Sequence, residues 1–195
     1  MNRTIWMRAL LVILAIAFST AAFAQYDESD TSKFSAFIGL YQPSGATLRN
    51  GGDSLWKTFG VGYSLKMDAA GRPKSYVAVE YSGSQGDHFT GKRTSLTYMQ
   101  MFRPKPKSEE DVRGFYLGAG VSANLVQEKL DAQDFVMPPI PGEDNSGTQF
   151  GVTVVGGYDF GSSFYVEGRY TKMSELAKDA DFSGLSVFVG SRSLF

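Results

Sequence analysis

Residues 114–128 read GFYLGAGVSANLVQE, and bulky or apolar side chains occupy every second position of this stretch. A period of two is the pattern of a β-strand, whose successive side chains point to opposite faces of the sheet. The two faces differ in character, with Phe115, Leu117, Ala119, Val121, Ala123 and Leu125 opposing Tyr116, Gly118, Gly120, Ser122 and Asn124. The stretch therefore predicts a strand that separates an apolar environment from one suited to small and polar groups.

Further segments of this kind follow one another along the chain, each bounded by turn residues. Together they predict eight strands at about 33–42, 57–66, 74–83, 94–103, 114–128, 147–160, 164–172 and 184–195. The composition agrees, because 22 glycines, 15 phenylalanines and 10 tyrosines suit strands better than helices. Only 173–181 reads as a candidate helical turn.

The chain begins with the features of a secretory leader. Arg3 and Arg8 precede and flank an apolar run, Ala9–Phe18, and Ala22-Phe23-Ala24 is a small-x-small cleavage site. The run is shorter than the roughly 20 residues that a membrane-spanning helix needs. We expect a signal peptide at 1–24 that directs Sec export and is cleaved after Ala24, a flexible lead-in at 25–32, and a single strand-rich domain at 33–195.

Charge and cysteine content exclude several classes of function. The formal net charge is −1, so the chain has no basic field for nucleic acid. Cysteine is absent, which excludes disulfides, thiolate metal sites and a lipid-modified N-terminal cysteine. Glycine pairs such as Gly60–Gly62 fall inside predicted strands with no helix after them, so a dinucleotide site is not expected. We expect no cofactor and no metal site.

The connections between the predicted strands mostly alternate in length. Stretches 43–56, 84–93, 129–145 and 173–183 are long, whereas 67–73 and 161–163 are short; 104–113 is the exception. Outer-membrane barrels have short periplasmic turns and long extracellular loops. The alternation predicts an antiparallel up-and-down transmembrane barrel with both termini on the periplasmic side.

The polar face of the strands decides which side is inside. It is mostly glycine, serine and threonine, which suits the narrow, side-chain-filled interior of an eight-stranded barrel. The apolar face then meets lipid, as in membrane barrels. The residues expected to face lipid are Phe59, Val61, Tyr63, Leu117, Val121, Val152, Val154, Val166, Tyr170, Val187 and Val189.

The last predicted strand, GLSVFVGSRSLF, ends the sequence at Phe195. A terminal strand that closes on phenylalanine resembles the assembly signal of bacterial outer-membrane barrels, although Ser193 stands where that family usually has a bulky apolar residue. With the leader and the strand pattern, the chain resembles the small porin-type barrels of the OmpA/OmpX kind. The resemblance implies residence in the outer membrane, contact with its lipid and lipopolysaccharide, and recognition by the barrel-assembly machinery. We expect a monomer.

Several charged residues fall on the inward face, where an unpaired charge would be costly. We expect a network in which Glu167 pairs with Arg169 and Arg192, with Glu80 joining them. The structural interpretation is a plug that stabilises a closed barrel, and the functional alternative is a gated pore. The inward charges are Lys66, Glu80, Arg103, Asp159, Glu167, Arg169 and Arg192.

Four functions remain open at this point. The first is a non-enzymatic outer-membrane barrel that serves envelope structure or surface interaction. The second is a narrow channel or transporter for a small or apolar solute. The third is a lipid A-modifying enzyme with His88, the single histidine, as its base near Ser82 and Ser84. The fourth is a secreted, soluble, lipocalin-like barrel. The apolar loop segment 135–141, FVMPPIP, is either an interaction site or a cover over the barrel mouth.

Overall fold

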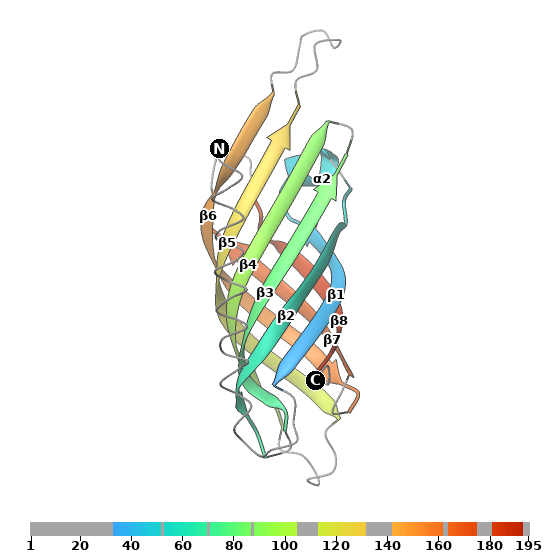
Figure 1. Cartoon of the computed structure of the whole chain (residues 1–195), viewed down its shortest axis with the longest axis vertical. Coiled ribbons are helices and arrows are strands. Elements are labelled where there is room, and N and C mark those ends of the chain that lie inside the picture. The colour runs from blue at the N-terminus through green and yellow to red at the C-terminus, as the bar shows by residue number, and fades with distance from the viewer. Residues whose placement is uncertain are drawn as a thin grey trace. The chain divides into compact units, whose positions relative to one another are not determined.

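A computed structural model of the protein describes residues 33–51, 53–69, 71–86, 88–104, 113–131, 142–161, 164–174 and 181–192. The expected leader, the lead-in, the apolar loop segment 135–141 and Phe195 lie outside these residues. The described part forms a β-barrel with one short helix (Figure 1): β1 (Phe34–Pro43), α2 (Ala46–Gly51), β2 (Trp56–Met67), β3 (Pro73–Gln85), β4 (Phe89–Phe102), β5 (Gly114–Leu130), β6 (Glu143–Asp159), β7 (Phe164–Met173) and β8 (Gly184–Ser191).

Each strand is antiparallel to its neighbours, and β1 also pairs with β8, which closes the barrel. The strand registers define the stagger of this closure. A path along paired residues leaves β6 at Gln149, passes through Glu80 and Phe37, and returns to β6 at Asp159, ten residues further along. A staggered eight-stranded barrel has tilted strands around an interior just wide enough for side chains to fill. The expected antiparallel eight-stranded barrel is confirmed.

The outer face of the barrel is apolar across the middle of its strands. Phe115 and Leu117 are 73% and 69% exposed, and the other residues assigned to lipid also point outward. Tyr63 is the most covered of them, because its ring packs at 5.0 Å from that of Phe34. The exposed members are Phe59, Val61, Leu117, Val121, Val152, Val154, Val166, Tyr170, Val187 and Val189.

Glycines on neighbouring strands make room for the large rings that point inward. A Cβ atom at these glycines would lie less than 3.0 Å from the nearest atom of the facing ring, much closer than van der Waals contact allows, so only glycine leaves room for the ring. The pairs that face each other in register are Phe37 with Gly60, Tyr116 with Gly157, and Tyr165 with Gly190. The high glycine content and the high aromatic content of the chain therefore have a common explanation, since each inward ring of these pairs packs over a glycine.

Four strands extend further than the sequence pattern predicts, and Figure 1 shows them projecting beyond the rest of the barrel at the end that carries α2. β3 and β4 are separated only by residues 86–88, so the predicted long connection 84–93 is wrong. β5 reaches Leu130 and β6 starts at Glu143, whereas pairing of β6 with β7 stops at Gly151. The polar residues of these extensions resemble a loop in composition, but their backbones continue the ladder.

The helix also differs from expectation. In the described part of the chain it is α2, inside the stretch 43–56 that the sequence predicts as a loop, and its Leu48 is fully buried. The expected helical turn at 173–181 is not formed at its start, where Met173 ends β7; residues 175–180 lie outside the described ranges. Within the described ranges, no helix is long and apolar enough to cross a bilayer.

The glycine packing gives a first test. Gly157→Val would set a side chain against the Tyr116 ring and a Cβ atom 2.7 Å from the carbonyl oxygen of Val166. We expect the free energy of unfolding to fall by about 1–3 kcal/mol through overpacking. Urea unfolding of protein refolded in detergent micelles measures this loss.

Gly156→Val is the matched control, because Gly156 lies on the outward side of β6. A Cβ atom built on it would be 3.4 Å from its nearest side-chain neighbour, Leu117, which is an ordinary contact. Its effect should stay within about 0.5 kcal/mol. Equal losses in the two variants would show that the inward and outward assignments on β6 are mistaken.

Candidate functional site

Two acidic and two basic side chains meet in the middle of the lumen. Glu80 on β3 forms ion pairs with Arg93 on β4 and with Arg169 on β7, the latter at 3.3 Å between Oε2 and Nη1. Arg169 also forms an ion pair with Glu167 through its Nε. All four side chains are at most 5% exposed. Strands from opposite sides of the barrel are therefore tied together by charge across its interior.

Two tyrosines complete the surroundings of Glu167. Tyr76 donates its hydroxyl to Glu167 at 3.0 Å and accepts a bond from Nη2 of Arg169 at 2.8 Å. Tyr116 donates to Oε2 of Glu167 at 2.8 Å. Charge-assisted bonds of this kind are stronger than neutral ones. Glu167 is consequently held by three side chains from three other positions on the barrel wall.

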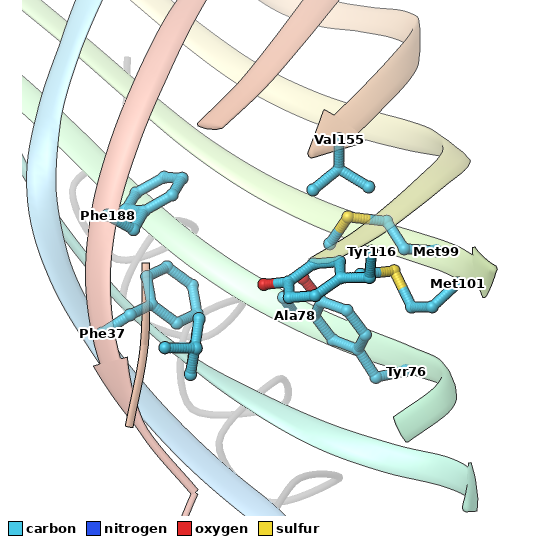
Figure 2. Packing of buried hydrophobic residues seen from close by; sticks show 9 residues of the cluster. Phe37, Tyr76, Ala78, Met99, Met101, Tyr116, Val155 and Phe188 are labelled. Atoms are coloured by element: carbon cyan, nitrogen blue, oxygen red, sulfur yellow. The ribbon is translucent and has the colours of Figure 1, made fainter. Parts of the chain in front are cut away.

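The rings of Phe37 and Phe188, drawn in Figure 2, lie directly against the charged cluster. The guanidinium of Arg169 lies 4.8 Å from the ring centre of Phe37 and 4.6 Å from that of Phe188. The two rings contact each other edge to face at 4.9 Å. A desolvated guanidinium over aromatic faces gains cation–π attraction, which partly offsets the loss of water.

A second charged cluster lies where β6 and β8 end. Asp159 accepts from Arg103 at 3.1 Å and from Arg192 at 2.5 Å, and it is itself 1% exposed. Arg103 also donates to the carbonyl oxygen of Pro73. Arg192 lies 4.3 Å from the ring centre of Tyr165. This cluster joins the ends of strands that lie far apart in the sequence.

An apolar cluster fills the opposite end of the lumen. Its rings contact one another edge to face, with Trp56 5.5 Å from Tyr41 and 6.0 Å from Phe182. Arg93 lies 3.9 Å from the ring centre of Tyr41, so the apolar cluster borders the charged one. Its members are Tyr41, Leu48, Trp56, Phe89, Val126, Met173 and Phe182.

The segment that carries Phe182 is fixed to the start of the β1–β2 connection. Backbone bonds join Ser44 to Ser183 at 2.6 Å and Gly45 to Asp181 at 3.1 Å. The Asp181 carboxylate accepts from the backbone of Ser183 at 2.9 Å. Partial burial acts to raise the pKa of Asp181, but the hydrogen bonds from Ser183 and the nearby Lys172 ammonium outweigh it and leave the pKa below its usual value. This end of the lumen is closed by bonded backbone as well as by packing.

Paired charges and packed side chains occupy the lumen. Its two charged clusters contain four arginines and three carboxylates, all engaged in the ion pairs above. Between them and around them lie the apolar clusters and a belt of hydroxyl and amide groups, such as Thr153 bonded to Thr171 at 2.9 Å. Among the described residues the buried polar atoms that lack a partner are Nε1 of Trp56, Nε of Arg93, Nη2 of Arg103 and both amide atoms of Gln149.

The structure brings together only some of the residues predicted for the network. Glu80, Glu167 and Arg169 meet as expected. Arg192 does not reach Glu167, because it lies at the end of β8 and pairs with Asp159 instead. Lys66 does not belong to the lumen at all: a register irregularity between Ser64 and Lys66 turns its side chain outward, where it is exposed.

Sequence reasoning missed Arg93, Tyr76 and Tyr116 as network members. Arg93 was excluded because the predicted strand began at Thr94. The signal that reveals it is the alternation of the whole of β4, in which Phe89, Gly91, Arg93, Ser95 and Thr97 share the inward face. Tyr76 and Tyr116 lie on the inward face as hydrogen-bond donors, a role that composition alone does not distinguish from packing.

The arrangement around His88 does not form a nucleophile and base. His88 is exposed beside the hairpin turn between β3 and β4, whereas Ser82 and Ser84 point into the barrel. Ser82 is bonded to Thr58 at 2.8 Å, and Ser84 accepts from the backbone of Asp53 at 3.0 Å. Within the described ranges no three histidine or acidic side chains come together as a metal site.

Solved structures share this fold. The N-terminal beta-barrel domain of Pseudomonas aeruginosa OprF matches with a TM-score of 0.50 and 14% identity, over 83% of this chain and 97% of that one. Neisserial surface protein A (NspA) matches with a TM-score of 0.50 and 14% identity, over 84% and 99% of the two chains. No protein-family model and no curated protein sequence matches. At this identity the likeness establishes the fold.

The central ion pairs give a second test. Arg169→Met would leave Glu80 and Glu167 buried with one cation fewer, so we expect a loss of about 3–5 kcal/mol in unfolding free energy. Urea unfolding in detergent micelles measures it. Lys74→Met removes an exposed charge from β3 and should change stability by no more than about 0.5 kcal/mol. An Arg169→Met loss as small as that of the control would contradict a stabilising role for the network.

Proposed function

We propose that the chain is an integral outer-membrane barrel protein without enzymatic activity, whose closed lumen suits it to envelope structure or surface interaction. The observation that carries the proposal is the inversion of polarity: apolar side chains cover the outside of a barrel whose interior holds buried ion pairs. A closed barrel satisfies its backbone hydrogen bonds internally, which is what a structure in hydrocarbon requires.

The exposed apolar surface is too extensive for a soluble monomer. Monomeric soluble proteins rarely expose contiguous apolar patches of more than a few hundred Å². Here every strand contributes outward apolar residues, and the most exposed exceed two-thirds of their free area: Ile38 at 70%, Leu117 at 69%, Phe115 at 73% and Phe150 at 70%. A lipocalin-like alternative would need these side chains inside, around a ligand.

Aromatic residues gather at both limits of the apolar surface, as the interfacial girdles of membrane barrels do. At one end Phe115, Tyr158 and Phe160 contact each other at 4.8 and 4.9 Å. At the other, Phe59 and Tyr81 lie 5.4 Å apart. The pattern supports a membrane-spanning zone between these two sets of rings.

The filled lumen argues against the channel alternative, because ion pairs and rings occupy the path from one end to the other. The exposed position of His88 argues against the lipid A-modifying alternative. We place the chain termini on the periplasmic side, since β3–β6 project from the opposite end and extracellular segments are the longer ones in such barrels. One of the structural neighbours is described as a surface protein, which suits a role in surface interaction.

Membrane fractionation tests the proposal directly. We expect the full-length precursor, expressed in a Gram-negative host, to be recovered in the outer-membrane fraction, released only by detergent. Its gel mobility should change on boiling, because a closed barrel resists unfolding in cold detergent. Recovery in the soluble periplasm without detergent would exclude the membrane assignment and favour the lipocalin-like alternative.

A substitution at the outer face tests the lipid-facing assignment. Val154 is 59% exposed in the apolar zone of β6, and Val154→Arg should cost roughly 2–4 kcal/mol in unfolding free energy if the site lies near the bilayer midplane. Protein refolded into phospholipid vesicles allows the measurement. Thr148→Arg, also outward on β6 but beyond the apolar zone, should cost about 1 kcal/mol or less. Equal stability of the two variants would overturn the assignment.

A further inference from the structure

Two lysines lie on the outer face at the limit of the apolar zone, separated by a glycine. Lys57 on β2 is paired in register with Gly83 on β3, which is paired in turn with Lys92 on β4. Both lysines are exposed and share the outward side of the barrel. Adjacent strands lie about 4.8 Å apart, so the two lysine backbones are roughly 10 Å apart. Two flexible stems can close that distance around one ligand.

Gly83, which has no side chain, lies between the lysines, and the Tyr81 ring and hydroxyl occupy the space above it. A Cβ atom built on Gly83 would be 3.0 Å from the hydroxyl oxygen of Tyr81. The Tyr81 side chain therefore covers Gly83 and brings its hydroxyl to the row formed by Lys57, Gly83 and Lys92. Two ammonium groups and a phenolic hydroxyl offer several hydrogen-bond donors to one place. An anion with several acceptor oxygens, such as a phosphate monoester, fits this donor set.

Neither lysine forms an ion pair with any described residue. The other outward lysines at this end do: Lys129 pairs with Asp131 at 2.6 Å, and Lys172 with Asp181 at 3.4 Å. The neighbours that continue the row, Leu40 beside Lys57 and Gln127 beside Lys92, carry no charge. Within the row itself, the two ammonium groups therefore have no carboxylate partner.

The position of the lysine row at the edge of the apolar zone points to a lipid as the source of the anion. Phe59 and Tyr81, which contact each other at 5.4 Å, are the next outward residues toward the apolar zone. An amphiphile can therefore lay its acyl chains along Phe59 and the apolar face while its phosphate meets the lysines. A free phosphate would gain nothing from that adjoining apolar surface.

We propose that Lys57, Lys92 and Tyr81 form a binding site for the phosphate of a phosphorylated glycolipid of the outer leaflet, the chemistry of the lipid A part of lipopolysaccharide. The site rests on the proposed membrane location and orientation and adds a defined lipid contact to them. The contact lies on the lateral wall, independent of the closed lumen.

The test uses the full mature protein refolded in neutral detergent, titrated with lipopolysaccharide and followed by native mass spectrometry. A Lys57→Gln, Lys92→Gln double variant should bind at least about tenfold more weakly, since each lysine contributes to attraction of anionic headgroups. The matched control is Lys66→Gln, Lys74→Gln, which removes two exposed lysines from the other ends of β2 and β3. Its binding should stay within twofold of the unaltered protein.

Two further arms identify the ligand group. Lipopolysaccharide stripped of its lipid A phosphates should bind the unaltered protein and the double variant equally weakly. Gly83→Leu, which keeps both lysines but displaces the Tyr81 side chain from its place over residue 83, should weaken binding of the phosphorylated form.

The opposite results each overturn the proposal. Equal losses in the double variant and its control would mean that only total charge matters. Equal binding of the phosphate-free lipid would mean that acyl chains alone are recognised. Competition by millimolar inorganic phosphate as effective as that of the lipid would mean a free-anion site. The protein would still fractionate with the outer membrane in all three cases, so failure here is distinguishable from failure of the proposed function.

Discussion

The closure of eight staggered strands is the constraint on which the rest of the structure depends. It fixes an interior only as wide as a few side chains, so each inward position must suit that space. Rings are admitted where the facing residue is glycine, as at Tyr116 over Gly157 and Tyr165 over Gly190. Charges are admitted where a partner reaches across from another strand, as Arg169 does to Glu80. Small hydroxyl residues fill what remains. The unusual composition of the chain follows from this geometry.

The ion pairs of the lumen act within that geometry as long-range connections. Glu80 and Arg169 are 89 residues apart in sequence, and Tyr116 and Glu167 are 51 apart. Such contacts form only when the barrel closes with one register, because a slip by one residue would turn each inward charge toward the outside. In hydrocarbon that error would be costly. The buried charges therefore favour one closed register over its neighbours, in addition to whatever net stability they contribute.

The alternation of side chains was sufficient to predict the strand number, the antiparallel barrel and the sidedness of each strand, because period two survives wherever one face differs from the other. It failed where that contrast fades. The start of β4 resembles a loop in sequence, because both of its faces carry polar or small residues, such as Thr90, Gly91 and Lys92. Its pairing with β3 and β5 nevertheless continues there. The failure at Lys66 has a different origin, a local register irregularity that reverses the side-chain direction. The pairing of Arg192 with Asp159 depends on how far neighbouring strands are staggered along the barrel, and the alternation within one strand carries no information about that stagger.

A closed lumen also determines where specific recognition can occur. With ion pairs and rings filling the interior, a ligand must meet either the lateral wall or the projecting ends of β3–β6. In the proposed membrane setting, the apolar zone of the wall meets hydrocarbon throughout, so selectivity requires polar groups at its limit. Two lysines at the limit nearest α2 are paired locally, Lys129 with Asp131 and Lys172 with Asp181. Lys57 and Lys92 differ because the residue between them is a glycine and the next residues in the row are uncharged. The same narrow closure that fills the interior thus leaves the outer wall for recognition, and the row of Lys57 and Lys92 is the part of it that we propose distinguishes one lipid from another.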